Sequence, residues 1–143
     1  MTIQNTQQNA LEDIKVNLKI KLASLWTASM FLIIYLDYFA LYMPENIEGI
    51  QSGHIYVFDI TQGFLLAALA SVSFPALMIF LSVALPAAIN RWTNIISATV
   101  YIPYMLFNLA GEAWMHMVFG AVLEVILFCL VIRYAWKWPR VET

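Results

Sequence analysis

Residues 19–44, KIKLASLWTASMFLIIYLDYFALYMP, decide the class of this protein. An apolar run extends from about residue 22 to residue 43 and ends at Pro44. About 20 such residues are enough for a helix to cross the hydrocarbon core of a bilayer. The run is longer than the apolar part of a signal peptide, and no clear small-residue cleavage site follows it. The stretch therefore predicts a membrane helix that the protein retains.

Three further apolar runs of the same kind follow, over about residues 61–85, 92–110 and 113–136. We therefore predict an all-α, multi-pass membrane protein, an antiparallel four-transmembrane-helix bundle. Tight connections after the second and third runs predict that the last three helices are sequential neighbours. The composition agrees, since 62% of the residues are hydrophobic and 11% are charged, whereas a soluble domain has about 25% charged residues.

This prediction divides the chain into three parts. Residues 1–18 and 139–143 form polar cytoplasmic tails, and residues 19–138 form the membrane domain, with an outer loop at 44–60.

The basic residues all fall on one side of a four-span chain. Lys and Arg occur before the first run, between the second and third, and at the end of the fourth: Lys15, Lys19, Lys21, Arg91, Arg133, Lys137 and Arg140. The opposite side carries only acids: Glu45, Glu48, Asp59 and Glu112. Since short cytoplasmic segments are enriched in Lys and Arg, both termini are predicted to be cytoplasmic.

Polar and small residues follow single faces of the predicted helices. The third run carries residues spaced three or four apart: Asn94, Ser97, Tyr101, Tyr104, Asn108 and Gly111. The fourth carries residues spaced four apart: Glu112, His116, Gly120 and Glu124. The second carries a stripe that would allow close helix approach: Gly63, Ala67, Ser71 and Pro75. Lipid cannot satisfy polar groups, so these faces should turn inward.

Glu124 is the deepest candidate for a functional residue, near the middle of the membrane. A charge at that depth costs about 2.5–3.5 kcal/mol on insertion scales, so the carboxyl should be protonated at rest or paired. Pro75 and Pro103 cannot donate to the carbonyls of Ser71 and Thr99. Glu124 could donate to such a carbonyl, either as part of a proton- or cation-responsive site or only to hold the helices together.

An outer cavity is predicted above Glu124. Asp37, Asn108, Glu112 and His116 have similar depths near the outer surface, with His54 and Asp59 as a potential roof, and Tyr101 and Tyr104 along the wall. Glu112 and His116 could also share a metal ion, but their Glu-x-x-x-His spacing departs from the Glu-x-x-His of di-iron bundles. We expect no metal and no cofactor.

Two further stretches, FDITQGFLLAA and GEAWMHMVFGAVLE, form a sequence pattern together with residues 19–44. Together they resemble an uncharacterised family of small bacterial four-span membrane proteins, over about residues 15–138. The chain is also similar in shape to the small four-helix proteins grouped around DoxX. The resemblance implies the fold and a location in a bacterial inner membrane, and no particular activity.

The function favoured by these residues is binding or moving a small solute or cation, with protonation of Glu124. The expected partners are the lipid bilayer and that solute, cation or proton, and a homo-oligomer is left open. No basic stripe for nucleic acid is present, and a non-enzymatic role is favoured. The alternatives are a small membrane oxidoreductase or a quinone- or haem-binding subunit, and a structural membrane subunit. The single cysteine and the lack of a second histidine within the spans count against the former.

Overall fold

The computed structural model describes residues 14–110 and 113–139, which form five helices and one small hairpin. The four long helices are α1 (Leu18–Ala40), α3 (Gln62–Ala84), α4 (Ala87–Phe107) and α5 (Met115–Trp136). The connection between α1 and α3 contains α2 (Asn46–Gln51), β1 (His54–Ile55) and β2 (Phe58–Asp59). The prediction of an all-α fold is confirmed. The one addition in this part of the chain is a hairpin of two strands with two residues each.

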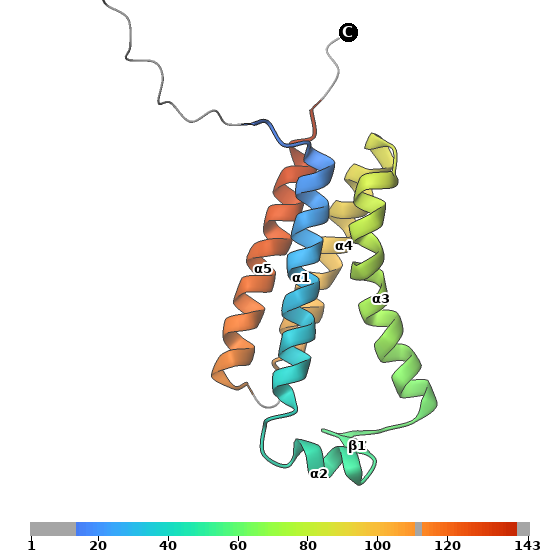
Figure 1. Ribbon diagram of the computed structural model, residues 1–143, viewed down its shortest axis with the longest axis vertical. Helices are drawn as coiled ribbons and strands as arrows, with labels where there is room; N and C mark the ends of the chain where they lie inside the picture. Colours follow the sequence, from blue (N-terminus) through green and yellow to red (C-terminus); the bar gives the residue numbers. More distant parts are fainter. Residues whose placement is uncertain (1–13, 111–112, 140–143) are drawn as a thin grey trace, which may run out of the picture.

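The four long helices stand side by side, and the chain alternates in direction from each to the next (Figure 1). The start of α1 and the end of α5 lie at one end of the molecule, called here the terminal end. The segment with α2 and the hairpin folds under the other end, called the loop end. Helix α1 packs against both α3 and α5, and α4 packs against α5.

Three of the described helices, α1, α3 and α5, are long and apolar enough to cross a membrane. Helix α4 is as long, with 21 residues, but its inward side is polar. Four of its buried residues are polar or carry a hydroxyl: Asn90, Asn94, Ser97 and Tyr101. These side chains lower the average hydropathy of α4, although its outer face is apolar.

Polar side chains close the helix ends. The Asn17 side chain accepts a hydrogen bond from the Lys19 backbone N–H at the start of α1, and Thr61 accepts one from Phe64 at the start of α3. The Lys19 ammonium donates to the carbonyls of Val83 (3.1 Å) and Leu85 (2.7 Å). Because a helix C-terminus carries unpaired carbonyls and a partial negative charge, this contact joins α1 to the end of α3.

Helix α3 contributes to the bundle mainly from Ser71 onward. Pro75, Met78 and Ser82 are its buried residues, and Figure 1 shows the first half diverging from the other helices towards the loop end. The predicted small-residue stripe is therefore wrong at Gly63 and Ala67, which are exposed. Helices α3 and α4 also approach each other less closely than sequential neighbours were expected to, because aromatic side chains fill the space between them.

Close approach occurs instead between α1 and α5, at Gly120. A Cβ atom added to Gly120 would lie 2.5 Å from Leu36 Cδ2 and 2.9 Å from Leu36 Cγ. These separations are below van der Waals contact, so a larger residue would push Leu36 away. The absence of a side chain at Gly120 thus leaves room for the Leu36 side chain of α1 against α5.

We expect Gly120→Ala to lower the free energy of unfolding by about 1–3 kcal/mol, the usual cost of overpacking. Thermal unfolding in detergent, followed by circular dichroism, measures the change. Gly63→Ala is the matched control, because a Cβ there meets only Thr61 Oγ1, at 3.9 Å. Adding Leu36→Ala should restore much of the stability lost in Gly120→Ala. Equal effects at Gly120 and Gly63 would contradict the assignment.

Candidate functional site

Tyr101 lies at the centre of the bundle and touches all four long helices. Its ring packs against Trp26 of α1, Phe74 of α3, Tyr104 of α4 and Phe128 of α5, with centroids 5.7–6.2 Å apart. Its hydroxyl donates a hydrogen bond of 2.5 Å to the Ser71 carbonyl. Pro75 cannot donate to that carbonyl from within α3. Tyr101 therefore donates to the freed carbonyl of Ser71, and the prediction that Glu124 donates to this carbonyl is wrong.

A second polar cluster is fully buried nearer the terminal end. The Trp26 indole N–H donates to Asn94 Oδ1 (2.7 Å), and the Ser82 hydroxyl donates to the same oxygen (3.2 Å). Asn94 Nδ2 donates to Asn90 Oδ1 (2.7 Å), while Asn90 Nδ2 donates to the Ser82 carbonyl (2.6 Å). This network joins α1, α3 and α4. Since its members satisfy one another, it holds the helices together and offers no free group to a ligand.

Glu124 is also buried, but its carboxyl group lacks the hydrogen bonds that the members of the polar cluster make to one another. The residue is 2% exposed, and its Oε1 has no hydrogen-bond partner within residues 14–110 and 113–139. Asp37 of α1 is the acid close enough to interact with it electrostatically. An unpaired polar atom in an apolar interior is costly, and such atoms concentrate where a protein binds a proton, an ion or water.

His116 lies two turns from Glu124 towards the loop end of α5. Its Nε2 is buried and, like Glu124 Oε1, lacks a partner in the described part of the chain. The ring meets Trp114 edge-on, with centroids 6.2 Å apart. Two unsatisfied titratable side chains thus occur along one helix, about 12 Å apart by the rise of an α-helix.

Asp37 opens onto a cavity at the loop end with a volume of about 910 Å³. The walls come from the end of α1, from α2, from the hairpin and from the residue before α5: Asp37, Tyr38, Glu45, His54, Tyr56 and Trp114 are among them. His54 Nε2 lies 3.0 Å from Asp59 Oδ1 across the hairpin. The hairpin therefore covers the cavity with its polar pair already matched.

The structure places the other predicted site residues apart from this cavity. Asn108 ends α4, and its amide is 4.0 Å from Met105 Sδ. Tyr104 is half-exposed, and its hydroxyl donates to Ser71 Oγ at 3.2 Å. Glu112 lies outside the described residues. Asp37 and His54 therefore both line the cavity, whereas His116 and Asn108 are not among its lining residues.

Sequence reasoning missed several residues of these sites. Trp26 was not singled out as a site residue, although it is fully buried and its indole N–H donates to Asn94. Asn90 and Ser82 were overlooked, although Asn90 lies one turn before Asn94 on the same face of α4. Trp114 and Tyr38 also line the cavity without having been singled out. A polar residue one turn from a predicted polar stripe is the signal that could have identified Asn90.

We expect Tyr101→Phe to destabilise the bundle by about 1–3 kcal/mol, because the Ser71 carbonyl would lose its donor while staying buried. Tyr104→Phe removes the longer bond to Ser71 Oγ from a half-exposed ring and should change stability by about 0.5 kcal/mol or less. Thermal unfolding of the two variants in the same detergent compares them directly. A Tyr101→Phe variant as stable as the wild type would show that the freed carbonyl does not depend on this hydroxyl.

The comparisons with known proteins give one family match. The family of unknown function DUF6326 matches residues 11–143. No curated protein and no solved structure matches the chain. The resemblance to an uncharacterised family is confirmed, while the likeness in shape to DoxX-type proteins stays a prediction. Because the match covers nearly the whole sequence, this chain belongs to the family of unknown function DUF6326.

Proposed function

We propose that this protein spans the bacterial cytoplasmic membrane four times and binds or moves a small cation or solute as Glu124 gains or loses a proton. The observation that carries the proposal is the buried carboxyl of Glu124, whose Oε1 has no partner in the described chain. Ionisable groups inside membrane helices are costly and mark ion pathways and proton relays more often than packing contacts.

The proposal of four spans depends on α4. Its 21 residues extend about 30 Å at 1.5 Å per residue, the thickness of the hydrocarbon core. Its polar residues are buried against the other helices, and its exposed large side chains are mostly apolar: Ile89, Ile96, Val100, Leu106 and Phe107 are examples. A helix polar towards its neighbours and apolar outward suits a bundle in lipid.

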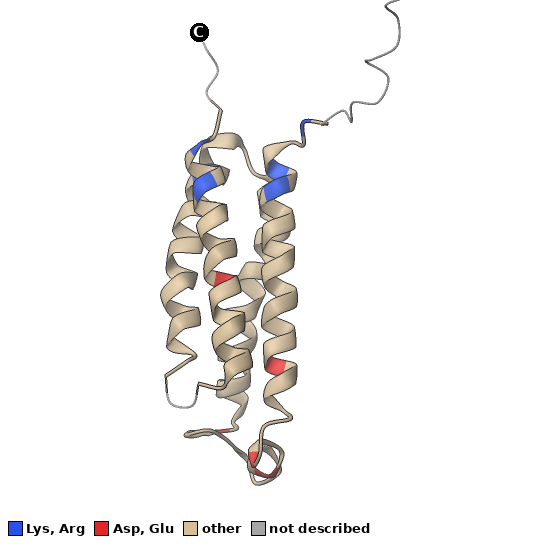
Figure 2. Ribbon diagram, turned by 90° about the vertical axis from the view of Figure 1, so that its left-hand side faces the viewer, with Lys and Arg blue, Asp and Glu red and all other residues tan. Residues whose placement is uncertain are grey.

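The distribution of charge supports the orientation. Figure 2 shows Lys and Arg at the terminal end and Asp and Glu at mid-height and at the loop end. The basic side chains are also held there, since Lys19 binds the end of α3 and the Arg91 guanidinium lies 5.3 Å from the Trp92 ring centre. By the positive-inside rule the terminal end faces the cytoplasm and the loop end faces outward.

We expect reporter fusions to place both ends of the chain in the cytoplasm. A periplasm-active reporter should be silent after Thr143 and active when inserted within Gly49–Gly53, at the end of α2. A cytoplasm-active reporter should give the reverse pattern at the same two sites. An active periplasmic reporter at Thr143 would reject the four-span orientation.

The proposed mechanism uses the surroundings of Glu124. Burying the neutral carboxyl without hydrogen bonds is far less costly than burying the ionised carboxylate, which needs a positive partner. Asp37 carries no positive charge, so it cannot supply that partner. A cation that enters from the loop end could supply it, and the proton would then leave. Binding and deprotonation are thereby coupled.

Glu124→Gln preserves the shape of the side chain but cannot titrate. We expect the wild-type protein in liposomes to release protons into weakly buffered medium when a panel of inorganic and organic monovalent cations is added, and the Gln variant to release none. A pH-indicator dye measures the release, and protein-free liposomes provide the background. Infrared titration gives a second reading, since a carboxyl band that disappears with pH in the wild type should be absent from Glu124→Gln. The proposal fails if Glu124 is already ionised at neutral pH.

A further inference from the structure

The cavity at the loop end has the size of a ligand site. Its volume of about 910 Å³ falls in the range of small-molecule pockets, about 300–1,000 Å³. It is enclosed by four separate elements, namely the end of α1, α2, the hairpin and the residue preceding α5. A site assembled from segments far apart in the sequence requires the folded chain, and so differs from a chance groove along one helix.

The electrostatic character of this cavity is negative. The acidic residues Asp37 and Glu45 line it. Among the described residues no Lys or Arg lines the wall, and the basic side chains lie at the far end of the bundle (Figure 2). A cation is therefore the favoured occupant.

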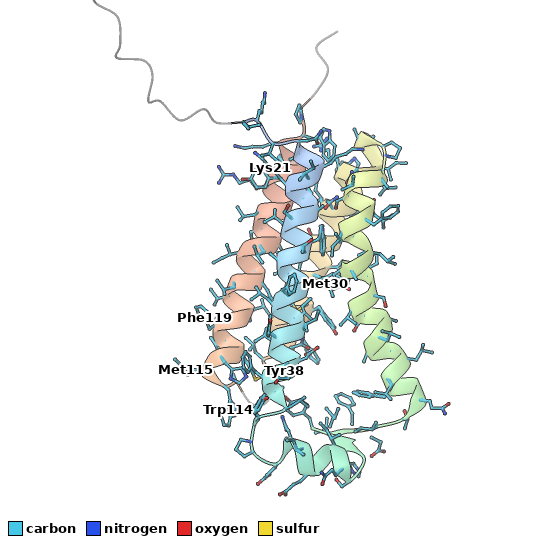
Figure 3. The ribbon with its side chains drawn as sticks, in the orientation of Figure 1. Lys21, Met30, Tyr38, Trp114, Met115 and Phe119 are labelled. Carbon is cyan, nitrogen blue, oxygen red and sulfur yellow. The ribbon has the colours of Figure 1, made fainter. Side chains whose placement is uncertain are left out.

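Aromatic faces make up much of the remaining wall. Tyr38, Tyr56 and Trp114 line the cavity, and Figure 3 shows Trp114 and Tyr38 at the loop end, where α5 begins and α1 ends. The Tyr38 hydroxyl already shares a hydrogen bond of 2.6 Å with the Tyr42 hydroxyl. Aromatic faces attract cations through their quadrupoles, most strongly for Trp, and such cages recognise quaternary ammonium groups.

The wall fits an organic cation better than a metal ion. Hard metal ions require six or more oxygen ligands or a tight group of His, Cys and carboxylates. No group of three such side chains occurs in the described part of the chain, and Ile34, Ile50 and Ile55 add apolar surface. A weakly hydrated cation with an apolar body would use both the acids and this carbon surface.

We infer that the loop-end cavity binds an organic ammonium cation, with Trp114, Tyr38 and Tyr56 around its apolar groups and Asp37 as its counter-ion. The inference rests on the proposed function, because it takes the cavity as the outer entrance to the Glu124 site, and it names the class of cation that enters. Asp37 lines the cavity from α1, and Glu124 lies on α5, which packs against α1.

Benzyltrimethylammonium is a suitable probe, and neopentylbenzene is its neutral counterpart, with carbon in place of the charged nitrogen. Isothermal titration calorimetry with the full chain in lipid nanodiscs measures binding of each, and empty nanodiscs correct for partition into lipid. We expect saturable binding of the cation at one site and none of the neutral compound. Saturable binding of both compounds would overturn the inference, as would binding of neither.

Variants locate the site. Trp114→Ala and Asp37→Asn should each weaken binding of benzyltrimethylammonium about tenfold, the range of a desolvated cation–π contact or ion pair, and Trp114→Phe should have a smaller effect than Trp114→Ala. Phe119→Ala is the matched control, because this exposed aromatic residue of α5 lies outside the cavity wall. It should bind within about twofold of the wild type, a change below 0.5 kcal/mol. Full affinity in Trp114→Ala, with circular dichroism unchanged, would remove the cavity from consideration.

Glu124→Gln separates this inference from the proposed function. If it binds benzyltrimethylammonium like the wild type but releases no protons, both stand. If it binds and still releases protons as the wild type does, the cavity assignment stands and the coupling to Glu124 fails. If the wild type releases protons with other cations but does not bind this probe, the coupling stands and the organic-cation site is overturned.

Discussion

The main constraint on this fold is that polar groups in apolar surroundings need partners within the protein. The hydrogen bond from the Tyr101 hydroxyl to the Ser71 carbonyl meets this requirement at the centre of the bundle. Pro75 creates the free carbonyl, and α4 supplies the donor. The same residue then packs its ring against every other long helix. With the Trp26–Asn94–Ser82 network nearer the terminal end, it determines which side of α4 turns inward. Packing of the apolar residues follows from that choice.

The helical class and the positions of the long helices could be predicted from the sequence, because run length and proline positions are local properties. The polar face of α4 could be predicted for the same reason, since Asn94, Ser97 and Tyr101 repeat with the period of a helix. The small residues of α3 do repeat with the period of a helix, but they do not lie against a neighbouring helix along the whole stripe. Gly63 and Ala67 are exposed because the first half of α3 diverges from the bundle, and no local pattern records the direction of a helix axis.

The depth of Glu124 within the bundle could be predicted from the sequence. The contacts that the site residues make could not. The depth of Glu124 followed from counting along α5, and its burial follows the spacing of Gly120 and Glu124 on one side of that helix. The donor to the Ser71 carbonyl could not be predicted, because Tyr101 and Glu124 reach a similar level and only their side-chain packing decides between them. The cavity depends on how residues 44–60 fold under the bundle, which involves contacts between distant segments. Its aromatic lining therefore became apparent only in three dimensions.

The hydrogen bond from Trp26 to Asn94 spans 68 positions of the chain, and this separation has a consequence for biosynthesis. Chains are made from the N-terminus, so α1 is complete well before the ribosome has added α4. During that interval the indole N–H of Trp26 lacks the partner that it has in the finished protein, whereas Lys19 meets its partners Val83 and Leu85 as soon as α3 is complete. In the proposed membrane setting, helices insert first and associate afterwards, so the indole would meanwhile be served by lipid headgroups or water. The bundle can be completed only after α4, the third long helix, has been made. The synthesis of α4 is therefore the step that commits the chain to its final arrangement.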